Sequence, residues 1–203
     1  MVYKNLFLRI VFSLLIFGLF IVSLQNNKLI LLFGLVIYVV IILEVIKFFK
    51  IYYYLILIYV ILSILSFIIY INYFYNFYLF NILLFSLISL DSFSFFFGKL
   101  FGKKNIFKKI SPNKTLEGYL GGFLMTNLIF LIYCYLNEYI FFENIVLINL
   151  FILSGIIGDL IQSYFKRVNK IKDSSNYLPG HGGFFDRFDS FMSSIILLTI
   201  ISL

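Results

Sequence analysis

The sequence has little of what a water-soluble domain needs at its surface. Only 12% of its 203 residues are charged, 63% are hydrophobic, and neither alanine nor tryptophan occurs. A soluble domain of this length must cover its core with polar residues, and there are too few of them here. The single cysteine, Cys134, excludes an internal disulfide bond. The composition therefore predicts an all-α polytopic membrane protein.

Long apolar runs are present instead. Seven of them approach the roughly 20 residues that a helix needs to cross a hydrocarbon layer of about 30 Å. We expect about seven transmembrane helices within the runs 6–24, 29–46, 51–71, 77–97, 119–136, 145–162 and 184–203. A cleaved signal peptide is the alternative for the first run. That run is long for a signal peptide and no small-residue cleavage site follows it, so we expect an uncleaved span.

The cations are distributed unevenly among the connecting segments. With the N-terminus in the cytoplasm, the two basic loops 98–118 and 163–183 lie on the cytoplasmic side, Lys28 lies outside, and Arg187 lies at the edge of a span. The positive-inside rule therefore predicts a cytoplasmic N-terminus and an outer C-terminus. Much of the net charge of +7 is then cytoplasmic, where it suits anionic headgroups or nucleotide phosphates and not the readout of nucleic acid.

The two halves of the chain differ in glycine and proline. Only Gly18 and Gly34 precede residue 98, and both prolines lie in the basic loops. We interpret residues 1–90 as a membrane scaffold and residues 91–203 as the catalytic region. Glu44, an acid of the scaffold, lies one turn from Lys47, and we expect these two to pair at the membrane edge.

Carboxylates inside apolar runs need an explanation, because a charge in hydrocarbon costs several kcal/mol unless it is partnered or hydrated. Four lie in or beside the runs: Asp91, Asp159, Asp186 and Asp189. Asp186 and Asp189 are three residues apart and share a helix face, where both could meet Asp159. Oxygen ligands of this kind suit Mg²⁺ or a similar hard ion such as Mn²⁺. The alternative is that neighbouring cations such as Lys166 or Arg167 form salt bridges with these acids.

The turn Pro-Gly-His-Gly-Gly at 179–183 precedes a helix that we expect to begin at Phe184. Its successive N–H groups, including those of Gly182 and Gly183, could bind an anion with help from the helix N-terminus. Glycine-rich turns also occur merely to reverse the chain. His181, the only histidine, could donate a hydrogen bond to a phosphate oxygen, protonate a leaving group or brace the loop.

The segment KISPNKTLEG at 109–118 is a second polar constellation. Ser111, Lys114 and Thr115 offer hydroxyls and a cation to phosphates. The alternative is a capping segment, in which Ser111 or Asn113 precedes a helix that begins near Thr115. The glycine and lysine spacing of a Walker loop is absent.

Together these motifs resemble the phosphatidate cytidylyltransferase family, also called CDP-diacylglycerol synthases. The resemblance covers residues 91 to about 191 and rests on DSFSFFFGKLFGK, SPNKTLEG, GDLIQSYFKR and KDSSNYLPGHGGFFDRFDS. The sequence departs from the family pattern at Gln162, where a glutamate is usual, and at Phe95, where a tyrosine is common.

The resemblance implies transfer of a cytidylyl group from CTP to phosphatidic acid, which gives CDP-diacylglycerol and pyrophosphate. It implies that Asp159 and Asp186 hold a catalytic Mg²⁺ (or Mn²⁺) and that a monovalent cation binds nearby. We also expect Lys172 and His181 to take part in catalysis and Asp189 to be a further metal ligand. By the same resemblance the residues facing substrate include Lys166, Arg167, Lys172, Asp173 and Arg187. It further implies a homodimer among membrane lipids, with no nucleic-acid partner, in a plasma membrane of bacterial type with a cytoplasmic active site.

Two other functions stay open on the residues alone. A polyprenol or phytol kinase would also use CTP but would transfer the γ-phosphoryl group. A transporter component without enzymatic activity would use the carboxylates as an ion path. The CDP-alcohol phosphatidyltransferases are excluded because the D-G-x-x-A-R run that they need is missing.

Overall fold

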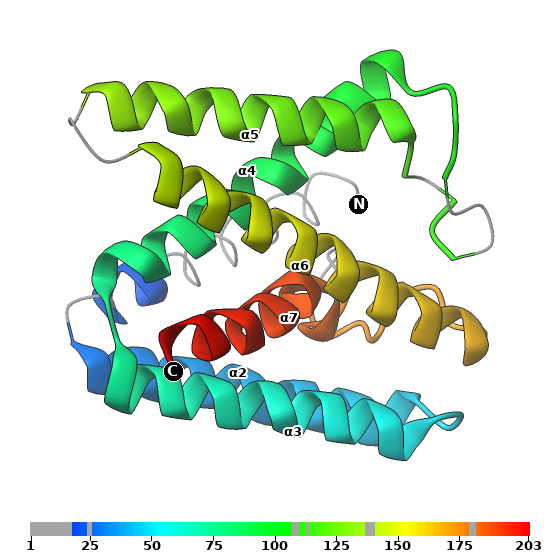
Figure 1. Ribbon diagram of the computed structural model, residues 1–203. Coiled ribbons are helices and arrows are strands. Elements are labelled where there is room, and N and C mark those ends of the chain that lie inside the picture. Colours follow the sequence, from blue (N-terminus) through cyan, green and yellow to red (C-terminus); the bar gives the residue numbers. More distant parts are fainter. Residues whose placement is uncertain (1–17, 24–25, 107–109, 113, 137–140, 179–181) are drawn as a thin grey trace. The chain divides into compact units, whose positions relative to one another are not determined.

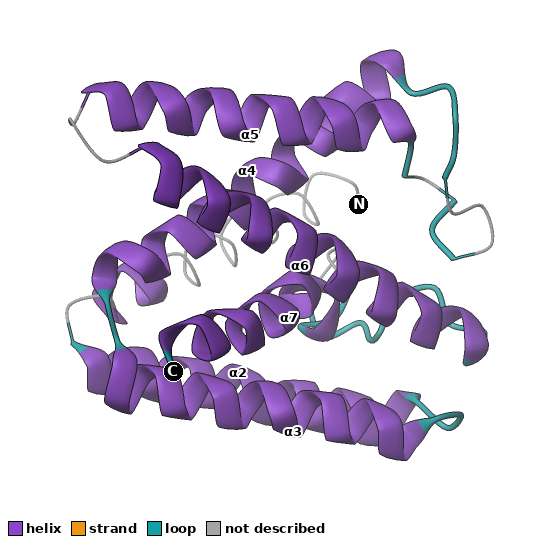
Figure 2. Cartoon of the chain, viewed as in Figure 1, coloured by secondary structure: helices purple, strands orange, loops and turns teal. Residues whose placement is uncertain are grey.

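The structure, a computed structural model, describes residues 18–23, 26–106, 110–112, 114–136, 141–178 and 182–203. Their main elements are α2 (Asn27–Phe48), α3 (Tyr53–Ile69), the π-helical turn η1 (Tyr70–Phe74), α4 (Phe77–Phe101), α5 (Leu116–Leu136), α6 (Phe141–Val168) and α7 (Phe185–Ser202) (Figure 1). Among these residues the regular elements are all helical, as Figure 2 shows. The prediction of an all-α protein is confirmed.

Five helical segments of the described chain are long and apolar enough to cross a membrane. They are α2, α3 together with η1, α4, α5 and α6. Large apolar side chains on all of them are exposed, as is expected of helices that face lipid. The seventh expected span corresponds to α7, which has 18 residues and carries Asp186, Arg187 and Asp189 in its first two turns. Most of the first run, 6–24, lies outside the described residues, so the count of seven stays a prediction.

The structure shortens both predicted basic loops. The first runs only from residue 102 to residue 115, because α4 continues to Phe101 and α5 begins at Leu116. α6 continues to Val168, so Lys166 and Arg167 lie in its last turn and the connecting segment begins only at residue 169. Lysine and arginine are good helix formers, and a cation near a helix C-terminus is stabilised by the helix dipole. Lys170, whose φ of 57° is left-handed, follows the end of the helix.

The chain forms two compact units, and the first consists of Met1–Tyr75 with Phe165–Leu203. In this unit α7 packs against α3, and the Thr199 hydroxyl donates to the Ser66 carbonyl at 3.0 Å (Figure 1). Tyr38 on α2 and Ser63 on α3 share a buried hydrogen bond. Fully buried apolar side chains from all three helices form the core of the unit: Ile41, Val45, Ile56, Val60, Phe185, Met192, Ile195 and Leu198.

The second unit is Asn76–Tyr164 and contains α4, α5 and most of α6. α4 and α5 pack very closely because α5 presents glycine to α4 at three positions: Gly118, Gly121 and Gly122. Small residues at this spacing let two membrane helices approach with their backbones almost in contact. Asn127 on α5 also donates to Asn149 on α6 at 3.1 Å. The close approach fixes where the loop between α4 and α5 begins and ends.

Candidate active site

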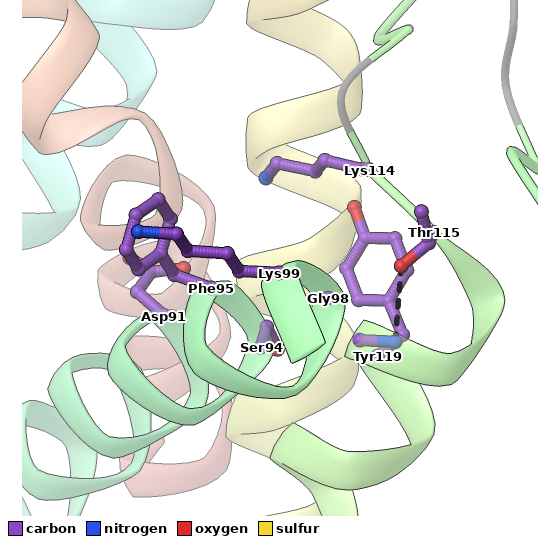
Figure 3. A pocket seen from close by; sticks show the side chains of 9 residues that line it. Asp91, Ser94, Phe95, Gly98, Lys99, Lys114, Thr115 and Tyr119 are labelled. Carbon is purple, nitrogen blue, oxygen red and sulfur yellow. Dashed lines mark hydrogen bonds between the residues drawn. The ribbon is translucent and has the colours of Figure 1, made fainter. Parts of the chain in front are cut away.

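A cavity of about 450 Å³ opens in the second unit where α4 ends and α5 begins. Its lining residues are Asp91, Ser94, Phe95, Gly98, Lys99, Lys114, Thr115, Gly118 and Tyr119. Figure 3 shows these residues gathered from the last turns of α4, from the end of the loop at Lys114 and Thr115, and from the first turn of α5. The volume falls within the range of small-molecule sites, and the lining combines aromatic surface with a few charged and hydroxyl groups, as in most such sites.

Lys114, a predicted substrate ligand, forms an ion pair with Asp159 of α6 inside the second unit. The Asp159 side chain is only 11% exposed and that of Lys114 is 33% exposed. Burial alone would lower the pKa of Lys114, but the Asp159 carboxylate together with Tyr119 and Asp91 outweighs burial and holds this pKa above its ordinary value. The ammonium also lies 5.6 Å from the centre of the Tyr119 ring. Lys114 is therefore a stable cation between the cavity and a buried carboxylate.

The start of α5 holds the basic loop in place. The Thr115 hydroxyl accepts from the Gly118 N–H at 3.2 Å, as an N-cap residue does, so the predicted helix start near Thr115 is confirmed. Glu117 accepts from the N–H groups of Lys103 and Lys104 at 3.0 and 3.1 Å. Both ends of the loop are thus bonded to one helical turn at the rim of the cavity.

Asp186, in the first turn of α7, is the centre of the polar cluster in the first unit. Its Oδ1 accepts from the Lys166 ammonium at 2.7 Å. Its Oδ2 accepts from Ser174 N at 2.7 Å, from Ser174 Oγ at 3.0 Å and from Gly183 N at 3.1 Å. The carboxylate is 11% exposed, and these four donors fix its orientation.

The glycine turn closes tightly over this carboxylate. Leu178 N donates to the Gly182 carbonyl at 2.9 Å across residues that lie outside the description, among them His181. Gly182 has a φ of +80°, and a Cβ there would lie 2.9 Å from Asp186 Oδ2. We predicted that these N–H groups cradle an anion, and the anion that Gly183 N contacts in the structure is the Asp186 carboxylate.

The other predicted site residues lie around the ends of α6 and α7. Lys172 and Asp173 are exposed in the connecting segment, and Arg187 is exposed in the first turn of α7. Arg167 is exposed at the end of α6. Further residues complete the set: Ser111 is half-buried in the basic loop, Gln162 is fully buried on α6, and Asp189 accepts from Ser190 N at 2.7 Å.

Glu44 is a functional candidate that the sequence analysis missed. We expected a pair with Lys47 at the membrane edge, which is wrong. Glu44 is fully buried and accepts hydrogen bonds from the segment before α7, while Lys47 lies over the rings of Phe48 and Tyr177. The correction has a physical cause: a helical spacing of three reports only local neighbours, whereas the donors that satisfy Glu44 come from 130 or more residues further along the chain.

The two carboxylates that we predicted to hold a metal ion are each paired with a lysine, and the salt-bridge alternative is confirmed for Asp186, whose partner is Lys166. Asp159 and Asp186 each hold a lysine ammonium against a carboxylate oxygen, and Mg²⁺ binds oxygen of the same kind. Within the described part of the chain, His, Cys, Asp and Glu side chains form no group of three or more that could hold a metal ion. Asp159 and Asp186 belong to different units, so joint ligation of one ion, with or without Asp189, stays a prediction.

Comparison with known proteins places these motifs in a family. The chain belongs to the cytidylyltransferase family, whose model matches residues 2–203.

Among curated proteins it is similar to the phosphatidate cytidylyltransferases of three staphylococci. It is 42% identical over 116 residues to that of Staphylococcus aureus (strain COL), 42% over 113 residues to that of Staphylococcus haemolyticus, and 43% over 113 residues to that of Staphylococcus saprophyticus. Each match covers 55% of this chain and 44% of the relative, so less than half of each relative's length is matched.

Proposed function

We propose that this chain carries the catalytic residues of a phosphatidate cytidylyltransferase, a membrane nucleotidyltransferase of phospholipid synthesis. The family match over residues 2–203 and the names of the relatives support this activity. A phosphate oxygen of phosphatidic acid would form a bond to the α-phosphorus of CTP. The bond from that phosphorus to the bridging oxygen would break, releasing pyrophosphate and leaving CDP-diacylglycerol.

The observation that carries the proposal is that lysine–aspartate ion pairs join the signature segments. Lys114 of SPNKTLEG pairs with Asp159 of GDLIQSYFKR, and Lys166 of the same segment pairs with Asp186 of KDSSNYLPGHGGFFDRFDS. Phosphatidic acid is a phosphate monoester whose second pKa is about 6, so it is already largely dianionic at neutral pH and needs no strong base. The obstacle is the repulsion between two anionic reactants. A site of oriented cations and N–H donors addresses that obstacle directly.

The cavity at the start of α5 is the place where we expect phosphate to bind. Lys99 and Lys114 supply positive charge there and Thr115 supplies a hydroxyl, with Ser111 in the loop beside them. In the first unit the exposed Arg167, Lys172 and Arg187 would attract the other phosphates, while Lys166 keeps Asp186 in place. Asp173, Gly182 and His181 complete the proposed substrate and catalytic set.

We also propose that the reaction needs Mg²⁺ or Mn²⁺, with a monovalent cation nearby. When bound, the divalent ion would neutralise charge on the phosphates of CTP. Asp159 and Asp186 would hold it, and Asp189 is the third candidate ligand. Carboxylate oxygens are the ligands that Mg²⁺ prefers, and these aspartates lie in the two signature segments. A bound ion would take the place of the Lys114 and Lys166 ammonium groups on these oxygens.

The membrane setting follows from the apolar helices and the bacterial relatives. We propose an inner-membrane homodimer with a cytoplasmic N-terminus and seven spans, whose site faces the cytoplasm for CTP and the inner leaflet for the lipid. The segments that carry the proposed phosphate ligands are also the most basic ones, which supports a cytoplasmic site by the positive-inside rule.

Labelled CTP separates this reaction from the kinase reaction. The purified chain, in detergent with Mg²⁺ and phosphatidic acid, should transfer label from α-labelled CTP into lipid and release label from γ-labelled CTP as pyrophosphate. Lipid labelled only from γ-labelled CTP would refute the proposal in favour of a kinase. In sealed vesicles that contain the chain, ion flux without consumption of CTP would refute it in favour of a transporter. The family match favours neither alternative.

A further inference from the structure

Glu44 is a buried carboxylate with an unusually complete set of donors. The residue is fully buried in the middle of the first unit. Its Oε1 accepts from Ser175 Oγ at 2.7 Å and from Phe184 N at 2.8 Å. Its Oε2 accepts from Ser174 Oγ at 3.1 Å and from Phe185 N at 2.9 Å. Two hydroxyls and two backbone N–H groups thus satisfy both oxygens, an arrangement that suits the acceptor-only carboxylate form.

The donors show what stabilises this charge. Phe184 N and Phe185 N belong to the N-terminus of α7, where N–H groups lack intrahelical partners and the helix dipole favours an anion. The salt bridges among the described residues involve Asp159 and Asp186 and not Glu44. The cost of burying Glu44 is therefore offset by the loop before α7 and by the start of α7. The same hydrogen bonds tie the loop before α7 and the start of α7 to α2.

A single hydroxyl connects Glu44 to Asp186. Ser174 Oγ lies 3.1 Å from Glu44 Oε2 and 3.0 Å from Asp186 Oδ2. A hydroxyl has one hydrogen, so it donates to only one of these oxygens at a time. The backbone N–H of Ser174 donates to Asp186 Oδ2 at 2.7 Å whichever oxygen the hydroxyl contacts. Only glycine leaves room for this contact at position 183. A Cβ there would lie 2.6 Å from Glu44 Oε2 and would overlap Ser174 Oγ.

We propose that Glu44 is a positioning residue. It fixes residues 174–175 and the start of α7 at residues 184–185 and, through Ser174 and the start of α7, sets the orientation of the Asp186 carboxylate. The effect on catalysis rests on the proposed function, since it requires that Asp186 act in cytidylyl transfer. The effect of Glu44 on the structure of residues 174–175 and 184–185 does not depend on the proposed function. Residues 1–90 are then more than a membrane scaffold, because Glu44 of α2 directly contacts Ser175 and the start of α7.

The variant Glu44→Gln gives a sharp test in the full chain. Glutamine keeps the size of the side chain but replaces one acceptor oxygen with an NH₂ group, which would face a backbone N–H and a serine hydroxyl. The matched control is Tyr38→Phe, because Tyr38 also lies on α2. This variant removes a buried hydrogen bond to Ser63 of α3 and none of the hydrogen bonds of Glu44.

Hydrogen exchange measures the structural part independently of activity. Peptides from 172–186 should exchange at least about 10-fold faster in Glu44→Gln than in wild type, because the variant loses hydrogen bonds to a buried carboxylate and the segment then opens more often. The same peptides in Tyr38→Phe should match wild type. Unchanged exchange in Glu44→Gln, or an equal increase in the control, would overturn the proposal.

Kinetics measure the catalytic part. In Glu44→Gln, kcat for CDP-diacylglycerol should fall about 10- to 100-fold and the Mg²⁺ concentration for half-maximal rate should rise, whereas Tyr38→Phe should stay within about 2-fold of wild type. A kcat that stays within 2-fold in Glu44→Gln would overturn the proposal. A wild-type chain that makes no CDP-diacylglycerol would instead refute the proposed function, and the exchange measurement would still decide the role of Glu44.

If Glu44→Gln does not fold, Ser174→Ala tests the same connection. Exchange should again be faster and kcat should again fall.

Discussion

The close packing of α4 and α5 makes Gly121→Ala a quantitative test of the structure. A Cβ added at Gly121 would lie 2.5 Å from Phe97 Cβ and 2.8 Å from Phe97 Cδ1. Carbon atoms in contact are normally about 3.5–4.0 Å apart, so at least about 1 Å of movement is needed. Phe97 Cβ is fixed to the backbone of α4, and a rotation of the ring cannot provide that movement.

The expected loss of stability follows from two opposing effects. Overpacking a well-packed interface costs about 1–3 kcal/mol, while alanine in place of glycine gains up to about 1 kcal/mol of helix propensity. Because the clash is with an atom fixed to the backbone, the cost lies in the upper part of that range, about 2–3 kcal/mol. With the gain of about 1 kcal/mol subtracted, we expect Gly121→Ala to lose about 1–2 kcal/mol. At about 2–4 °C per kcal/mol for a chain of this size, the unfolding midpoint should fall by about 2–8 °C.

Cys134 provides the assay. It is the only cysteine, and it is buried on α5 itself, so a thiol-reactive dye reports the unfolding of this helix during a thermal scan in detergent. The matched control is Gly18→Ala, where an added Cβ has nothing within 4 Å and the midpoint should stay equal or rise. A midpoint for Gly121→Ala at or above that of wild type would show that α4 and α5 do not pack as closely as described.

Three further predictions concern the site. Asp186→Asn should lower the formation of CDP-diacylglycerol by about 100-fold or more, because an NH₂ group would replace a carboxylate oxygen that accepts from Lys166 or from N–H donors; turnover near the wild-type rate would remove Asp186 from the site. Thr115→Val should lower the unfolding midpoint by about 2–4 °C, because losing the N-cap of α5 costs about 1 kcal/mol; an unchanged midpoint in the Cys134 assay would contradict the cap. Chelation with EDTA should abolish product formation and added Mg²⁺ should restore it, whereas full activity in EDTA would exclude the proposed ion.

Local sequence patterns predicted the helices well and the loop boundaries less well. Apolar runs indicate where helices lie because burial in lipid depends on composition over about 20 residues. The end of α6 was placed too early, because Lys166 and Arg167 were assigned to a loop on account of their charge. Both side chains instead extend from the last helical turn, where charge is compatible with helix.

The polar contacts of the site depend on residues far apart in the sequence. The pairing of Lys114 with Asp159 spans 45 residues, and the bond from Ser175 to Glu44 spans 131. No local periodicity encodes such contacts. The sequence shows that Gly183 belongs to a glycine-rich turn. The close approach of the Glu44 carboxylate, which requires a glycine there, depends on the contact between α2 and residue 183.

The most direct test of the proposed function is the initial rate at which the purified chain converts CTP and phosphatidic acid into CDP-diacylglycerol with saturating Mg²⁺, measured for wild type beside Asp159→Asn. We predict steady product formation by the wild-type chain and a loss of about 100-fold or more in the variant. A wild-type chain that forms no CDP-diacylglycerol, or an Asp159→Asn variant that forms it at the wild-type rate, would contradict the assignment of these carboxylates to cytidylyl transfer.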